Sequence, residues 1–351
     1  MNAPFALPAR MRVADLSQAE EVARIEAFVF GQGGSIFHRP AWLHAVEEGT
    51  GNRALGLVAE RGGEIAGWLP LTEVHSAIFG RMLASSGFAV GGGALAADPM
   101  CSLELCRAAE ELAVRRNCTT IELRGGLAPE GWDERTDSHC GFVCELAEDE
   151  QAQLLAIPRK QRAEVRKGLQ NGLRVSIGTS EADREAHYAI YAESVRNLGT
   201  PVFPRALFDA VLDGLDADIL TVSHEGRPVA SVLSLHHDGA VMPYWGGGTL
   251  AARHLRANDV MYFALMNHAR IRGCTHFDFG RSKTGSGAFS FKRNWGFEPQ
   301  PLTYASWTAP GAAKRDADPN SDRHAARIAA WQHLPLGIAN CLGPIIARGL
   351  G

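Results

Sequence analysis

An internal repeat restricts what this chain can fold into more than any other feature of its sequence. Residues 108–124 align without a gap onto residues 264–280 with five identities, where about one is expected by chance at average residue usage. The identical pairs are Ala108/Ala264, Ala113/Ala269, Arg116/Arg272, Cys118/Cys274 and Thr119/Thr275, and the same offset of 156 pairs Gly91 and Gly92 with Gly247 and Gly248. Similarity at a fixed spacing is typical of duplicated structural units. The sequence therefore predicts two related halves, with independent convergence on one pattern as the alternative.

Each copy of the repeat contains the same series of expected elements. Residues 84–90 and 239–245 are expected to form strands that run into glycine turns, and an amphipathic helix follows in both copies. Short strands at 120–124 and 276–279 complete the two units. A strand, a helix and a second strand in this order form the crossover that places two strands in parallel. We therefore expect an α/β fold with two tandem domains of mixed sheets flanked by helices.

The length of 351 residues allows two domains with a core each. A polar, acidic stretch around residues 145–154 marks the seam and predicts domains at 1–150 and 151–310. Residues 311–324 have the composition of a linker, and residues 325–351 are expected to form a helical tail interrupted by prolines. The tail is interpreted either as a cap on the core or as a surface that contacts a membrane.

Composition and charge exclude several classes of protein. Hydrophobic residues make up 46%, charged residues 21%, and the net charge is −4, which is typical of a globular enzyme and indicates no DNA partner. We recognise no secretory signal and no apolar stretch of about 18 residues. The seven cysteines lack zinc-site spacing, and His236 and His237 point to opposite faces of an expected strand. We expect free thiols, no bound metal and a cytoplasmic location, peripheral to the inner membrane if the tail contacts it.

A cluster of basic residues opens the second half of the chain. It consists of Arg159, Lys160, Arg162, Arg166 and Lys167. A helix would project Arg159, Arg162 and Arg166 from one face, because they stand at positions i, i+3 and i+7. Arginine binds phosphate through two hydrogen bonds. We therefore take Arg162, Arg166 and Lys167 as candidate substrate-binding residues, with a solvated helix face as the alternative.

A second group of residues follows the last strand of the repeat. That strand ends at Asp278, and Arg281 follows in a loop rich in glycine. Lys292 lies between Phe291 and Trp295, where partial burial would strengthen the field of its charge. Ligands of open α/β sheets bind at the carboxyl ends of the strands. This loop is therefore a candidate site, with Arg281, Phe291 and Trp295 as candidate substrate-binding residues, and a surface hairpin is the alternative.

The third candidate is the sequence Tyr-Trp-Gly-Gly-Gly at positions 244–248. Glycines after a strand allow a ligand to approach the backbone, so Tyr244, Trp245 and Gly247 are candidate site residues. The run is a poor dinucleotide-binding motif, because the third glycine of that motif is missing. In the first half, Arg39 precedes the expected start of a helix. It is a candidate substrate-binding residue, and a purely structural role at the start of the helix is the alternative.

At these residues the sequence resembles the Fem family, within the GNAT superfamily. The resemblance rests on residues 37–42, 159–172, 244–247 and 277–280 and on Phe291-Lys292 ahead of Trp295-Gly296, and it covers about residues 10–310. More narrowly, the sequence is similar to Fem-related proteins associated with exosortase (PEP-CTERM) systems and envelope polysaccharide loci. This resemblance implies two GNAT-like domains with the active site in the second. It also implies transfer of an amino acid from aminoacyl-tRNA to an amine of a peptidoglycan precursor.

Two departures from the family leave the donor open between aminoacyl-tRNA and acyl-CoA. No long charged heptad insertion matches the helical arm for tRNA, and Arg281-Ser282-Lys283 replaces the second glycine usual after Asp-Phe-Gly. The chain also lacks the loop with which ordinary GNAT enzymes hold the pyrophosphate of coenzyme A. We therefore expect a donor that acts as a co-substrate, no tightly bound cofactor, and tRNA as a candidate partner.

The expected reaction is the formation of an amide on an amine of a small or lipid-linked cell-envelope precursor. By analogy with the family, Lys292 stabilises negative charge in the transition state or holds a phosphate. Asp278 orients a group or accepts a proton, and Tyr244 donates a hydrogen bond or protonates the leaving group. Two alternatives remain: an N-acetyltransferase-type enzyme that uses acyl-CoA, and a non-catalytic precursor-binding module or scaffold of an envelope export system.

Overall fold

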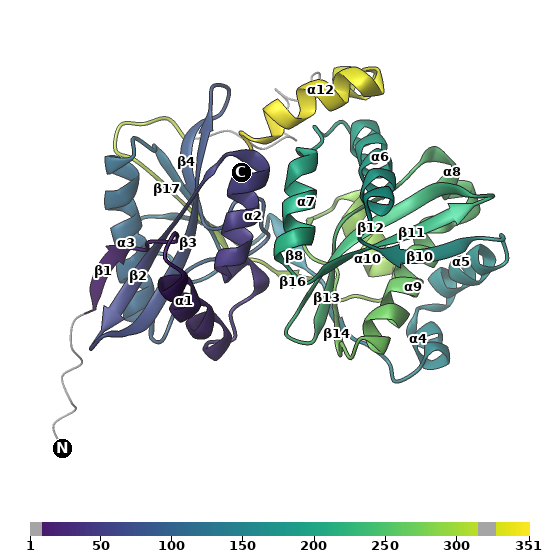
Figure 1. Cartoon of the computed structure of the whole chain (residues 1–351), viewed down its shortest axis with the longest axis horizontal. Helices are drawn as coiled ribbons and strands as arrows, with labels where there is room; N and C mark the ends of the chain where they lie inside the picture. Colours follow the sequence, from purple (N-terminus) through teal and green to yellow (C-terminus); the bar gives the residue numbers. More distant parts are fainter. Residues whose placement is uncertain (1–8, 315–327) are drawn as a thin grey trace. The chain divides into compact units, whose positions relative to one another are not determined.

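The computed structural model describes residues 9–314 and 328–351 (Figure 1). Contacts between residues divide the chain into two compact units. The described part of the first unit comprises residues 9–136, 303–314 and 348–351, and that of the second comprises residues 137–302 and 328–347. Each unit has a sheet flanked by helices and a hydrophobic core of its own.

A mixed eight-stranded sheet forms the framework of the first unit. Its strands follow the order β1-β2-β3-β4-β6-β17-β7, and β5 pairs with β3. The strands are β1 (Arg10–Val13), β2 (Arg53–Arg61), β3 (Glu64–Ser76), β4 (Gly80–Ala84), β5 (Leu95–Ala96), β6 (Thr120–Arg124), β7 (Asp133–Arg135) and β17 (Tyr304–Thr308). The helices are α1 (Ala19–Gly31), the 3-10 helix η1 (Ile36–His38), α2 (Pro40–Thr50) and α3 (Pro99–Arg115). Strands β4 and β6 are parallel, because α3 returns the chain to the same end of the sheet.

The second unit contains a six-stranded and a three-stranded sheet. The larger has the order β10-β11-β12-β13-β14-β9 and the smaller the order β15-β8-β16. The strands are β8 (His139–Gly141), β9 (Val143–Glu145), β10 (Arg174–Gly178), β11 (Ala217–His224), β12 (Arg227–His237), β13 (Ala240–Gly248), β14 (His276–Asp278), β15 (Ser282–Lys283) and β16 (Gln300–Pro301). The helices are α4 (Glu150–Ala156), α5 (Arg159–Leu169), α6 (Glu181–Leu198), α7 (Arg205–Gly214), α8 (Leu250–Leu255), α9 (Ala257–Ile271), α10 (Gly287–Asn294) and α12 (Leu336–Ala347).

The predicted strand–helix–strand unit is present in both halves, as β4–α3–β6 and as β13–α9–β14, each with a parallel strand pair. Two predicted bounds were wrong. The first strand ends at Ala84, because Ser86 and Phe88 have positive φ angles that a strand does not allow. In the second half the strand continues through Gly248, because all three glycines pair with β12 instead of turning away.

The two units differ from the predicted domain bounds at both seams. Residues 137–150 lie in the second unit, because β8 pairs with β15 and β9 pairs with β14. After residue 302 the chain returns to the first unit, where β17 pairs with β6 and β7. Residues 315–324 of the predicted linker lie outside the described residues. The predicted tail contains α12, which packs against α6. Residues 348–351, the last four of the tail, belong to the first unit.

Helix α6 forms one side of the candidate site, and its two ends follow from the sequence. Ser180 caps the N-terminus by accepting a hydrogen bond from Asp183, whose side chain accepts one from the backbone of Ser180 in return. Gly199 ends the helix in the left-handed conformation, with a φ of 81° that favours glycine. Because both ends are fixed in this way, the side chains of the last turn have a defined position beside β13.

Candidate functional site

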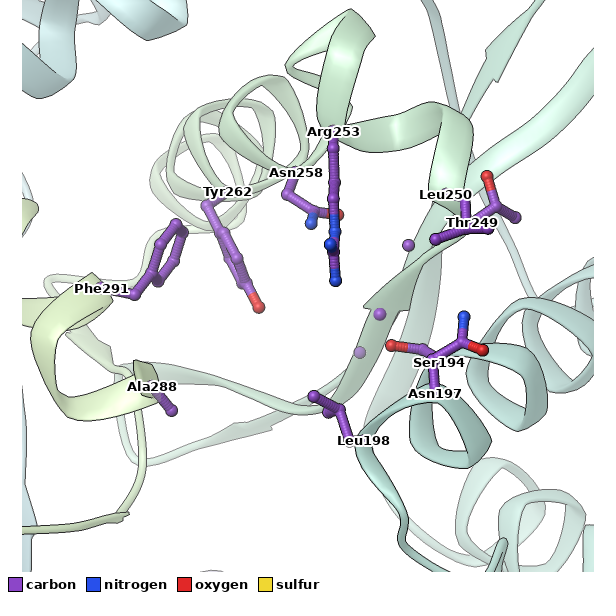
Figure 2. A pocket seen from close by; sticks show the side chains of 13 residues that line it. Ser194, Asn197, Leu198, Thr249, Leu250, Arg253, Asn258, Tyr262, Ala288 and Phe291 are labelled. Carbon is purple, nitrogen blue, oxygen red and sulfur yellow. The ribbon is translucent and has the colours of Figure 1, made fainter. Parts of the chain in front are cut away.

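The candidate site lies at the end of β13, beyond the point where this strand leaves its parallel neighbour. Strand β13 pairs with β14 only at Ala240 and Val241, whereas its pairing with β12 continues to Gly248. Side chains from α6, α8, α9 and α10 surround a cavity of about 290 Å³ at this end (Figure 2). The lining residues are Ser194, Asn197, Leu198, Gly246, Gly247, Gly248, Thr249, Leu250, Arg253, Asn258, Tyr262, Ala288 and Phe291.

The glycines of β13 are required by the close approach of neighbouring helices. A Cβ atom on Gly247 would lie 2.5 Å from the Cβ of Ser194 on α6, and one on Gly248 would lie 2.8 Å from the Cβ of Ala252 on α8 and 2.6 Å from the Oδ1 of Asn258 on α9. Real Cβ atoms do not come this close to such atoms, so any side chain here would push the helices apart. The glycines therefore leave the backbone of β13 open to the cavity and bring polar groups of α6 and α9 to its walls.

The polar lining of the cavity suits an anionic group or a strong hydrogen-bond acceptor. Arg253 extends from α8 into the space between α6 and α9 (Figure 2). Ser194 and Asn197 face it from α6, and Asn258 faces it from α9. Among the described residues that line the cavity, none is acidic. A phosphate or a carboxylate would therefore meet a guanidinium group and several neutral donors without repulsion.

Tyr262 supplies a hydroxyl group that points into the cavity from α9 (Figure 2). Its ring packs against Phe279, Phe291 and Trp295, with ring centroids between 4.7 and 6.2 Å apart. Burial raises the pKa of Tyr262 to about 12. The hydroxyl group therefore remains protonated at neutral pH and can donate a hydrogen bond to a group in the cavity.

Lys292, next to the lining residue Phe291 on α10, is held by backbone carbonyls and aromatic rings. Its Nζ donates to the carbonyl of Arg281 at 2.9 Å and to that of Gly280 at 3.2 Å. The same Nζ lies 5.3 Å from the ring centroid of Phe142 and 5.4 Å from that of Phe279, within the range of cation–π attraction. Burial lowers the pKa of Lys292 to about 8. The lysine therefore ties α10 to the turn that follows β14.

Asp278 belongs to the same turn. Its Oδ1 accepts a hydrogen bond from the backbone N–H of Gly280 at 2.8 Å. Burial raises the pKa of Asp278, although this hydrogen bond and the charge of Lys292 act in the opposite direction. The structure thus brings two of the three predicted catalytic residues, Lys292 and Asp278, together around Gly280, while neither of them lines the cavity.

The predicted residues of the Tyr-Trp-Gly-Gly-Gly run have different positions around the cavity. Gly247 lines it, and Trp245 is buried with its ring 4.6 Å from that of Phe208. Tyr244 is the extra residue of a β-bulge, since the register with β12 passes from Pro243 to Trp245 without it. Two more predicted residues come from the region of α10. Phe291 lines the cavity, and Trp295 is buried behind it.

The predicted basic residues are not part of the cavity wall. On α5, Arg162 donates from Nη1 to the carbonyl of Leu155, and Arg166 and Lys167 are exposed. Arg281 is half-buried in the turn that Lys292 holds. Arg39 belongs to the first unit, where it forms an ion pair with Glu26 and its guanidinium lies 5.3 Å from the ring centroid of Phe30. Its position at the N-terminal end of α2 fits the predicted helix entrance.

Sequence patterns missed the residues that point most directly into the cavity, namely Arg253, Tyr262, Asn258 and Ser194. Arg253 follows the last glycine of β13 by five positions, which is a usable signal for a basic group near a strand end. Tyr262 stands four positions after Asn258, so that both face the same side of α9. The apolar residues around Tyr262 give no indication of which neighbours face a cavity.

A buried polar cluster occurs elsewhere in the second unit. The Oδ2 of Asp218 lies 2.7 Å from the Nε2 of His268, 3.2 Å from the Nε2 of His236 and 3.0 Å from the Nη1 of Arg272. Burial alone would raise the pKa of Asp218, but hydrogen bonds to the two histidines lower it to about 2. The guanidinium group of Arg272 shares this carboxylate oxygen with the two histidines, so we interpret the cluster as a partly buried ion-pair network.

Comparisons with known proteins agree with this geometry. Residues 159–293 match the model of the acetyltransferase (GNAT) domain family, a segment that contains every residue lining the cavity. The structure is similar to a crystal structure of FemX, at 14% identity and a TM-score of 0.64, over 81% of this chain and 95% of that chain. It is also similar to a tandem GNAT protein from the clavulanic acid biosynthesis pathway, at 13% identity and a TM-score of 0.57, over 87% and 100%. The fold is a tandem GNAT fold.

A third similar structure is the C-terminal domain of a protein described as a lysylphosphatidylglycerol synthetase from Agrobacterium fabrum. It shares 15% identity at a TM-score of 0.55, over 82% of this chain and 92% of that chain. No curated protein matches the sequence of this chain. The predicted α/β class and its tandem GNAT-like arrangement are therefore confirmed, and the resemblance to the Fem and GNAT proteins holds at the level of the fold.

Proposed function

We propose that this protein is an acyltransferase that forms an amide by transferring an acyl or aminoacyl group from an ester or thioester donor to an amine. The observation that carries this proposal is the cavity at the free end of β13, with Arg253 and Tyr262 directed into it. The match of residues 159–293 to the GNAT acetyltransferase domain supports it, because all of the cavity lies within that segment.

The reaction needs an unprotonated amine and a polarised carbonyl group. The amine nitrogen bonds to the carbonyl carbon, and the carbon–oxygen or carbon–sulfur bond to the leaving group breaks. The nitrogen gives up a proton to water, and the leaving group receives one. In the proposed arrangement Tyr262 donates a hydrogen bond to the carbonyl oxygen or to the leaving group, where charge develops in the transition state. Binding both substrates in this geometry lowers the barrier without a dedicated base.

Lys292 and Asp278 are proposed to support this arrangement from outside the cavity lining. Lys292 places a buried positive charge beside the turn after β14, and its hydrogen bonds to the carbonyls of Gly280 and Arg281 hold α10 to that turn. We assign to Lys292 the stabilisation of negative charge, and to Asp278 the orientation of this turn through Gly280. Tyr244, at the bulge of β13, is assigned a hydrogen bond to the acceptor.

The donor is proposed to carry phosphate, because Arg253 is the cationic lining residue and several neutral donors surround it. Acyl-CoA and aminoacyl-tRNA both meet this requirement. The likeness to FemX and to the lysylphosphatidylglycerol synthetase domain favours an aminoacyl donor. Exposed cations on α5, among them Arg166 and Lys167, would then contact the nucleic acid. Arg162 and Arg281 remain candidate phosphate-binding residues.

The acceptor is proposed to be an amine of a small or lipid-linked precursor of the cell envelope, used in the cytoplasm or at the inner membrane. We also propose an association with an exosortase system. This part of the proposal is supported by the resemblance of the sequence to Fem-related proteins associated with such systems. The described residues contain no helix that is long and apolar enough to cross a membrane. A lipid-linked acceptor would therefore have to be reached from the membrane surface.

The test is binding of the purified protein to aminoacyl-tRNA and to acyl-CoA across a salt series, followed by analysis of products with an amine acceptor. We expect one donor to bind saturably, and Arg253→Ala to weaken it at least tenfold. Binding of tRNA would fall steeply with salt, because phosphate contacts release counterions. Arg227→Ala, an exposed arginine on β12, is the matched control. If the protein binds a donor but forms no acylated product, the proposed enzyme activity is wrong and a precursor-binding module is the better interpretation.

A further inference from the structure

Helix α12 is apolar on its buried face and also on its exposed face, which is unusual for a helix at the surface of a protein. Its twelve residues include no charged side chain. The whole described segment 328–351 contains no acidic residue, and its basic side chains are those of Arg348 and His333. A helix that is apolar on all sides is normally buried. The two faces of α12 therefore need separate explanations.

The inner face of α12 is made of small residues that fit tightly against the second unit. Ala339, Gly343 and Ala347 recur every four positions and are buried. A Cβ atom on Gly343 would lie 2.9 Å from the backbone nitrogen of Val202, so that only glycine allows this approach. Helix α12 also packs against α6. The small residues thus fix which side of the helix faces outward.

The outer face consists of Ile338, Cys341, Leu342 and Ile345, at positions i, i+3, i+4 and i+7. The relative exposures of the three large side chains are 49% for Ile338, 43% for Leu342 and 70% for Ile345. Residues with this spacing form one continuous stripe. Their exposure to water is unfavourable, because burying apolar side chains of this size stabilises a protein or a complex. The stripe is therefore a surface that lacks its partner among the described residues.

We propose that this outer face binds the surface of a lipid bilayer with anionic headgroups. The stripe is about 11 Å long from Ile338 to Ile345, given a rise of 1.5 Å per residue, and it is too small to supply the roughly 800 Å² per partner of a stable protein interface. A bilayer demands neither that area nor shape complementarity, since the apolar side chains enter the acyl region individually.

Charge and flanking residues agree with a lipid partner. Arg348 is exposed directly after the helix, and Arg196 donates from Nη1 to the carbonyl of Gln332 shortly before it. Cations therefore lie at both ends of an uncharged stripe, with no carboxylate between residues 328 and 351 to repel headgroups. Trp331 is half-buried at the same end as Arg196, and tryptophan favours the interface between water and lipid.

Vesicle flotation tests this proposal on the full chain. Vesicles of phosphatidylglycerol and phosphatidylethanolamine at about 30:70 are compared with vesicles of phosphatidylcholine alone, since anionic lipid attracts basic groups. We expect binding to the anionic vesicles and at least a tenfold weaker partition for Leu342→Glu/Ile345→Glu. The matched control is Ile271→Glu at the end of α9, where isoleucine is 76% exposed, outside the outer face. This control should bind as the unchanged protein does.

A second readout uses Cys341, which is exposed, whereas the other six cysteines are buried or half-buried. A polarity-sensitive fluorophore on Cys341 should shift to the blue when anionic vesicles are added, and labelling should fail in Cys341→Ser. Failure of the unchanged protein to float, or equal flotation of the double glutamate variant, overturns the proposal. A dimer in light scattering that the double variant abolishes would also overturn it. Acylation of a water-soluble amine is unaffected by the variant, which separates this proposal from the proposed function.

Discussion

Lys292 and Arg281 are joined by a hydrogen bond of 2.9 Å, in which the ammonium group of the lysine donates to the backbone carbonyl of the arginine. The ammonium group of Lys292 is therefore bound to the backbone that follows β14. Its loss would affect the position of α10 as well as the local charge. The two effects can be separated by measuring stability and activity in the same variants.

Replacing Lys292 by methionine is expected to lower turnover by about two orders of magnitude, the usual effect of losing one electrostatic group in an active site. The free energy of unfolding is expected to fall by about 2 kcal/mol, because two carbonyls lose a charged donor. Steady-state kinetics and urea denaturation measure the two quantities. Arg293→Ala, an exposed cation on the same helix, should change neither. An unchanged turnover in Lys292→Met would remove the lysine from the mechanism.

The pH dependence of turnover provides a separate test of Lys292. Its pKa of about 8 means that the charge is present at neutral pH and is lost as the pH rises through 8. If the charge is required, turnover should show a descending limb near pH 8. In Lys292→Arg the limb should move to higher pH, because arginine stays protonated throughout this range. A limb that stays at the same pH in the arginine variant would belong to another group.

Tyr262→Phe removes the hydroxyl group in the cavity and keeps the ring that packs on Phe279 and Trp295. We expect kcat to fall about tenfold to a hundredfold with little change in KM, since the hydrogen bond forms to charge that develops in the transition state. Tyr188→Phe removes a hydroxyl that donates to the carbonyl of Phe203 outside the cavity lining, and serves as the matched control. Equal kcat values for both variants would exclude a catalytic role for Tyr262.

Gly247→Ala is expected to destabilise the second unit, because the added Cβ would lie 2.5 Å from the Oγ of Ser194. Overpacking of this kind costs about 1–3 kcal/mol. The double variant Gly247→Ala/Ser194→Gly should recover part of that loss, because it removes the atoms that collide. A double-mutant cycle in urea measures the coupling. If the two losses simply add, α6 does not press on β13 at this point.

His187 makes the stability of the second unit depend on pH. Burial lowers the pKa of His187 to about 3, from 6.5 in the unfolded chain. Between these values the unfolded chain binds the additional proton, so the free energy of unfolding decreases as the pH falls, by about 1.4 kcal/mol per unit from this group. Urea denaturation at pH 7, 5.5 and 4.5 measures the slope. His187→Phe should flatten it, since phenylalanine fits beside Tyr191 and Phe208 and does not titrate.

The fold could be predicted from the sequence because its main signal is local and duplicated. The helices α3 and α9 and the strands that follow them repeat with the same spacing, so each copy supports the interpretation of the other. The ends of the strands could not be predicted as well. Glycine is typical of turns, yet Gly246 to Gly248 stay in β13 because β12 pairs with them. Pairing between strands is a tertiary effect that composition does not encode.

The candidate site was predicted in part. The neighbourhood of Phe291 and Lys292 indicated a buried cation, which the structure describes. The direction in which the Lys292 side chain points could not be inferred. Its hydrogen-bond acceptors are the backbone carbonyls of Gly280 and Arg281, and the turn that contains them sets their positions. The sequence did not predict Arg253 and Tyr262 as site residues, for a related reason. They face a cavity only because α6, α8 and α9 meet at the end of β13, and no sequence period encodes a meeting of several elements.

The return of the chain to the first unit at β17 has a consequence for the order in which the protein folds. Strand β17 pairs with both β6 and β7, although the entire larger sheet of the second unit precedes it in the sequence. On the ribosome, residues 137–302 would therefore emerge in full while β6 still lacks a neighbour on one side. The second unit can complete its sheet first, and the earlier half must wait with an open strand edge until residues 304–308 arrive. Most of the first unit is therefore synthesised before the second unit, and its sheet is completed after it.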